Sequence, residues 1–139
     1  MKDCVSYESA KALKDAGVVF DVEHAYLLMG DGSTRLIKII GSGALVFPAP
    51  TFCELFDALP DYIVVDNVRL SLYSAKVGSS HTGCKGNYYN AMYANVSNGI
   101  YFPIAAENAQ SPQDALSELI ISCLKMGYLT LEQINGEGV

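Results

Sequence analysis

The sequence is poor in charged residues, and most of those it has are acidic. Only 17% of its 139 residues are charged, and nine basic against fifteen acidic residues give a formal net charge of −6. An average soluble domain has about 25% charged residues, so the surface of this protein must carry unusually little charge. A net negative chain repels phosphate backbones. We therefore expect no nucleic-acid partner.

The sequence also lacks a long apolar run and any paired cysteine motif. Its longest uncharged stretches contain Gly, Pro and Ser and fall short of the ~20 apolar residues that cross a bilayer, and residues 1–7 have no signal-peptide core. The cysteines Cys4, Cys53, Cys84 and Cys123 are far apart and form no CxxC pair, which is typical of reduced thiols rather than of disulfides or structural zinc. We expect a cytoplasmic protein with no membrane contact, metal or cofactor.

Three segments have the capping residues and periodicity of helices. They are Tyr7–Ala16 behind Ser6, the run from Thr51 to Pro60, and the segment that opens at Ser111 and closes at Gly127. In the second segment, Thr51 and Glu54 have the spacing of a capping box. The last residues, 130–139, are expected to form a mobile tail, with a short helical turn at its start.

Apolar runs between these helices have the length and alternation of strands. They are His24–Met29, Arg35–Ile40, Leu45–Phe47, Ile63–Val65, Val68–Val77, Asn87–Ser97 and Ile100–Ile104. Most follow one another through short turns, which favours antiparallel pairing. We predict an α+β fold with one antiparallel sheet of about five or six strands and three helices packed mainly on one face, in a single domain of residues 1–139.

Three stretches, Ser6 to Gly17, Pro50 to Pro60 and Ala115 to Leu129, together carry a family resemblance. Their order and spacing resemble small uncharacterised proteins encoded by phages, prophages and mobile elements of gut bacteria. The resemblance covers the three helices and brings no catalytic residues with it. It implies a phage or mobile-element protein, with interference with a host or defence protein as one role by analogy.

The interval between Arg69 and Glu107 is rich in tyrosine and almost free of charge. Its only charged residues are Lys76 and Lys85, and its tyrosines are Tyr73, Tyr88, Tyr89, Tyr93 and Tyr101. Surface of this composition is typical of protein interfaces. We predict that Tyr73, Tyr89, Tyr93 and Asn95 lie on the sheet face away from the helices and bind a protein partner or a second copy in a homodimer. The alternative, that the tyrosines pack beneath the helices, stays open.

The loop between the two longest strands contains the best candidate for chemistry. His81, Cys84 and Lys85 are close in sequence, and a nearby Lys can lower a thiol pKa enough to make it a nucleophile. An incidental thiol in a loop is the favoured interpretation. Our leading hypothesis is therefore a non-enzymatic binding protein. A small-molecule binding protein with a Tyr-lined pocket is the second hypothesis, and a thiol enzyme using Cys84 and His81 is the third.

Overall fold

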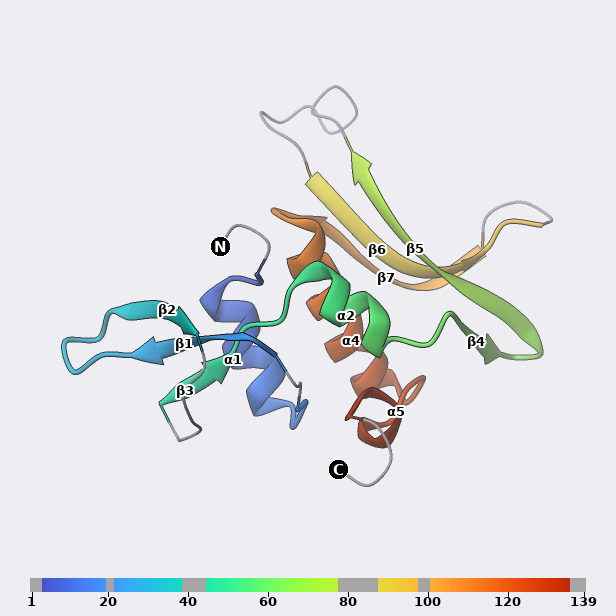
Figure 1. The fold of residues 1–139 in the computed structure, drawn as a ribbon. Coiled ribbons are helices and arrows are strands. Elements are labelled where there is room, and N and C mark those ends of the chain that lie inside the picture. The colour runs from blue at the N-terminus through green and yellow to red at the C-terminus, as the bar shows by residue number, and fades with distance from the viewer. Residues whose placement is uncertain (1–3, 20–21, 39–44, 78–87, 98–100, 136–139) are drawn as a thin grey trace.

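The computed structural model describes residues 4–19, 22–38, 45–77, 88–97 and 101–135, which form an α+β fold with two antiparallel sheets (Figure 1). The described elements, in chain order, are α1 (Tyr7–Asp15), β1 (His24–Leu28), β2 (Thr34–Lys38), β3 (Val46–Pro48), α2 (Phe52–Ala58), β4 (Tyr62–Val65), β5 (Val68–Val77), β6 (Tyr88–Asn95), β7 (Tyr101–Ala109), α4 (Pro112–Met126) and α5 (Leu131–Asn135). The predicted α+β class is confirmed. The element count is higher than predicted, with seven strands and four helices in this part of the chain.

The helix ends lie where the capping residues predicted them. The Thr51 side chain accepts a hydrogen bond from the Glu54 amide, and the Glu54 carboxylate accepts one from the Thr51 amide, so the capping box of α2 is complete. At α4, Ser111 caps the first turn and Gly127 ends the helix in the left-handed conformation, with φ of 80°. Glycine occupies that conformation without steric cost.

The prediction of a single sheet is wrong, because the strands form two separate ladders. One has the order β2-β1-β3 and the other the order β4-β5-β6-β7. Helix α2 follows directly after β3, so the chain leaves the first sheet before β4 begins the second. Helix α1 packs against β3, whereas α4 packs against β5, β6 and β7. The helices therefore lie between two sheets rather than on one face of one sheet (Figure 1).

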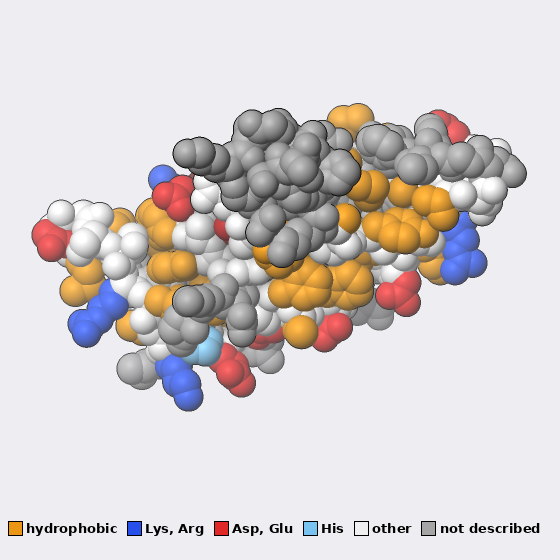
Figure 2. Space-filling model, turned by 90° about the horizontal axis from the view of Figure 1, so that it is seen from above, with side chains coloured by type: hydrophobic (Ala, Val, Ile, Leu, Met, Phe, Trp, Pro, Cys, Tyr) orange, Lys and Arg blue, Asp and Glu red, His pale blue; other side chains and the backbone are white. Residues whose placement is uncertain are grey.

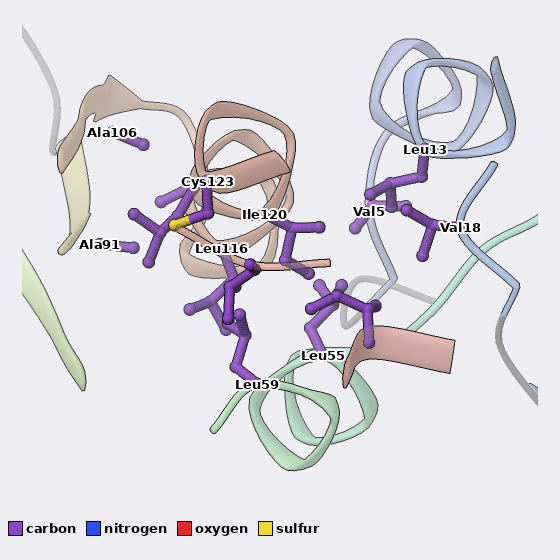
Figure 3. Close-up of a cluster of buried hydrophobic side chains, with 14 of the residues drawn as sticks. Val5, Leu13, Val18, Leu55, Leu59, Ala91, Ala106, Leu116, Ile120 and Cys123 are labelled. Atoms are coloured by element: carbon purple, nitrogen blue, oxygen red, sulfur yellow. The ribbon is translucent and has the colours of Figure 1, made fainter. Parts of the chain in front are cut away.

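The core is centred on α4, which contacts α1, α2 and the four-stranded sheet. Its inward side chains Leu116, Ile120 and Cys123 are fully buried. In Figure 3 they point toward Leu55 of α2 and the C-cap residue Leu59 on one side and toward the sheet residues Ala91 and Ala106 on another. Alanine at these sheet positions lets the helix approach the strands closely, because its side chain is short.

Residues 131–135 form helix α5, close to the short helical turn that was predicted at the start of 130–139. Ile134 is buried in the core. The Asn135 side chain accepts a hydrogen bond from the Val19 amide at 2.7 Å and donates one to the Gly17 carbonyl at 3.2 Å. These contacts join the C-terminal helix to the end of α1. Residues 136–139 lie outside the described part of the chain.

Candidate functional site

The four-stranded sheet has one face toward α4 and one face turned away from it, which we call the outer face. The register of the strands shows which side chains lie on which face. Leu72 lies opposite Tyr93, and Tyr93 lies opposite Ile104. Residues directly opposite each other in an antiparallel ladder share a face, and Tyr93 and Ile104 both belong to the core cluster. Alternation then places on the outer face Tyr62, Val64, Arg69, Ser71, Tyr73, Ala75, Asn90, Met92, Ala94 and Ala105.

Large side chains of this outer face are exposed to solvent. Val64 is 61% exposed, Tyr62 46% and Tyr73 39%, and Val96, just beyond the end of β6, is 53% exposed. Arg69 is the only charged residue in the set that defines the face. Seen from above in Figure 2, hydrophobic side chains reach the surface in several places, among them the right part of the molecule, where the four-stranded sheet lies. The described side chains of this face thus combine apolar area with a single cation.

The short β4–β5 hairpin puts Arg69 and Tyr62 side by side. Its two-residue turn, Asp66-Asn67, has φ of 53° and 67°, as in the turns that match the twist of paired strands. Val64 lies opposite Arg69 and Tyr62 opposite Ser71. The Arg69 Cζ lies 3.9 Å from the centroid of the Tyr62 ring. This cation–π contact orients the guanidinium across the outer face.

A hollow of about 270 Å³ lies beside this contact. Its lining consists of Arg69, Ser71, Tyr73, Ala94, Asn95, Val96 and Ser97. The Asn95 side chain donates a hydrogen bond to the Arg69 carbonyl at 3.0 Å and accepts one from the Ser97 amide at 3.0 Å. Ala94 of this lining is only 2% exposed. The described lining has hydroxyl, amide and guanidinium groups and no acid, so it suits an acceptor group of a partner better than a donor.

The predicted outward position of Tyr93 is wrong. Its ring is fully buried against the helices, and its hydroxyl donates a hydrogen bond to the Pro60 carbonyl at 2.7 Å. Burial raises the pKa of that hydroxyl above its ordinary value. Tyr89 lies four residues before Tyr93 and also packs against the core. The predicted outward position of Tyr89 is therefore wrong as well.

Tyr73 and Asn95 both line the outer hollow, and their role in binding stays a prediction. Asn95 is the last residue of β6, and its side chain reaches the Arg69 carbonyl across the β5–β6 pair. Sequence reasoning missed Tyr62 and Val64. The signal was present, because they alternate with the buried Ile63 in the strand just before a two-residue turn.

The residues predicted for thiol chemistry, His81, Cys84 and Lys85, lie outside the described residues. Of the described cysteines, Cys53 is exposed and Cys123 is buried. Burial raises the pKa of the Cys123 thiol to about 12, which leaves it protonated and unreactive at neutral pH. Within the described ranges, no group of three or more His, Cys, Asp or Glu residues is placed to hold a metal ion.

A second hollow lies where α1 meets α4 and has an acidic lining. Its residues are Ser6, Glu8, Ser9, Ala109, Gln110, Asp114 and Glu118. Asp114 has a structural role there, because its carboxylate accepts a hydrogen bond from the Ser6 amide at 2.9 Å. That bond ties the start of α1 to the first turn of α4. This hollow is explained by helix packing.

No family model, curated protein or solved structure matches this chain. None of the described helices combines the length and hydrophobicity that crossing a bilayer requires.

Proposed function

We propose that this protein acts without catalysis, by binding another protein through the outer face of its four-stranded sheet. The observation that carries the proposal is the exposure of Tyr62, Val64 and Tyr73 together on a face where Arg69 is the only charge among the ten residues used to define it. Exposed apolar area gathered in one place is typical of interaction sites. Tyr and Arg are also the residues that most often dominate binding energy.

The arrangement of Arg69 supports this proposal. Its guanidinium is held on the Tyr62 ring, so part of the side-chain entropy that binding would remove is already lost. An exposed lysine would not be oriented in this way, because its ammonium group is a flexible point charge. The acid-free hollow beside Arg69 favours a partner that offers a carboxylate or carbonyl oxygen at this position.

Site-specific photo-crosslinking tests the proposal without a known partner. The photoreactive residue p-benzoylphenylalanine would replace Val64 or Tyr73 on the outer face, and Lys11 on the exposed side of α1 as a matched control. We expect a crosslinked protein band from the two outer-face positions in the organism that encodes the protein, and none from position 11.

A second part of the crosslinking experiment places a charge on the outer face. Val64→Lys should abolish crosslinking from position 73, because an unpaired ammonium would have to be buried in the contact. Equal crosslinking from all three positions, or none from positions 64 and 73, would show that this face does not bind protein.

A phage or mobile-element origin is a separate proposal, which rests on the resemblance of the three helical segments. Sequencing the flanking genes tests it: phage structural or early genes on both sides support the origin, and housekeeping genes on both sides contradict it. We also propose a cytoplasmic location. The exposed thiol of Cys53 suits a reducing compartment, and fractionation with an antibody to the chain would test this.

A further inference from the structure

Strand β5 is longer than the edge strand that pairs with it. β5 runs from Val68 to Val77, but its ladder with β4 ends at the pair Tyr62–Ser71. One further hydrogen bond, from the Leu72 amide to the Asp61 carbonyl at 3.0 Å, closes that ladder. In Figure 1, β5 continues beyond β4 with β6 on one side only. The second half of β5 is thus an edge in the described part of the chain.

The Leu72 hydrogen bond also fixes which backbone groups face this edge. In an antiparallel strand, the amide and carbonyl of one residue point to the same side, and successive residues alternate. Because Leu72 points toward β4, Ser74 and Lys76 direct their amide and carbonyl groups toward the open side. Tyr73 and Ala75 direct theirs toward β6. Tyr73, Ser74 and Ala75 are all exposed, so β5 is uncovered on both faces here.

We propose that this edge pairs antiparallel with the same edge of a second copy, about a two-fold axis at Ala75. In this register Ser74 lies opposite Lys76 of the second copy, and Lys76 lies opposite its Ser74. The four amide and carbonyl groups of one edge then meet four of the other, which forms four backbone hydrogen bonds. The pairing adds a strand to an exposed edge, a common mode of recognition.

The local sequence favours a second copy as the occupant. The axis falls on Ala75, at a non-hydrogen-bonded pair, where Cα atoms approach to about 4.5 Å and small side chains fit. The register places Ser, and not a second Lys, opposite Lys76, so like charges do not lie directly across from each other. The outer faces of the two copies become one continuous surface. The inference rests on the strand edge and does not depend on the proposed function of that surface.

Proline substitution at the edge tests the pairing. Ser74→Pro removes the outward amide but no bond to β6, and proline is tolerated on edge strands. The matched control is Ser74→Thr, which keeps the amide. By sedimentation velocity from micromolar to millimolar concentration, the parent chain and Ser74→Thr should dimerise. Ser74→Pro should weaken the dimer about tenfold or more, because two hydrogen bonds are lost per dimer, with unchanged far-UV circular dichroism.

A cysteine at the axis tests the register. A Cα separation near 4.5 Å falls within the range that disulfides bridge. Ala75→Cys should form an intermolecular disulfide under mild oxidation, identified by mass spectrometry as a 75–75 linked peptide, and Ser74→Cys should form a 74–74 link more slowly because those positions lie diagonally. A parent chain that stays monomeric at millimolar concentration overturns the inference. So does a dimer that Val64→Lys dissociates and Ser74→Pro does not, since that dimer would use the outer face.

Discussion

Truncating Tyr93 distinguishes a tyrosine of the core from a tyrosine of the outer face. The ring is fully buried, and its hydroxyl donates to the Pro60 carbonyl at 2.7 Å. Tyr93→Phe keeps the ring and removes this hydrogen bond, so we expect the free energy of unfolding to fall by about 1–2 kcal/mol. Tyr93→Ala also leaves a cavity beneath α4, and replacing a large buried aromatic residue with alanine costs about 3–5 kcal/mol.

Tyr73 is the matched control, because it lies on the same sheet and is 39% exposed on the outer face. Tyr73→Ala should change the free energy of unfolding by less than about 1 kcal/mol. Urea unfolding followed by far-UV circular dichroism, under conditions where the chain is monomeric, measures all three variants against the parent. Equal effects of Tyr93→Ala and Tyr73→Ala would refute the assignment of faces in β6, and with it the definition of the outer face.

Three further predictions concern stability and thiol chemistry. Thr51→Ala should lower the free energy of unfolding by about 1 kcal/mol through loss of the capping box with Glu54, whereas Thr51→Ser, which keeps the cap, should not. Gly127→Ala should destabilise by roughly 1 kcal/mol because the position has φ of 80°; an unchanged melting temperature would contradict this. Burial raises the pKa of the Cys123 thiol from 9.0 to about 12. Between these two values the thiol ionises in the unfolded chain but not in the folded chain. Its contribution to stability is therefore complete below pH 9 and is lost as the pH rises toward 12. Cys123→Ala should flatten that alkaline loss, and in the folded parent Cys53 should react with a thiol reagent while Cys123 stays protected.

The elements themselves were largely predictable, because their signals are local. The capping residues Ser6, Thr51 and Ser111 start α1, α2 and α4 as predicted. The limits predicted for β5, Val68–Val77, are those observed. Capping and alternation act within a few residues of chain, so a single sequence contains them.

The number of sheets was not predictable in the same way, because it depends on contacts between distant segments. The sequences of β3 and β4 do not indicate whether the two strands belong to the same sheet. The separation follows from α2, which packs on α4 and occupies the space between the two sheets (Figure 1). That packing joins residues far apart in the chain.

The prediction of which β6 side chains face the helices was wrong for a different reason. Its sequence has apolar or aromatic residues at both alternating sets of positions, such as Tyr93 on one side and Met92 on the other, so periodicity does not choose a face. The register with β5 makes the choice by placing Tyr93 opposite Leu72. A shift of one residue would reverse every side chain. The register depends on a connection whose length, from 78 to 87, does not specify it.

The scarcity of charge between Arg69 and Glu107 has two physical causes, and the structure separates them. On the α4 side, residues such as Ala91, Tyr93 and Ile104 are buried, so charge is excluded there by the core and no partner is needed to explain it. On the outer side, Tyr73 and Ala75 of β5 are exposed, and a charged side chain there would cost nothing in the isolated chain. The core accounts for the first set alone, which is why the proposed binding surface contains Tyr73 and excludes Tyr93.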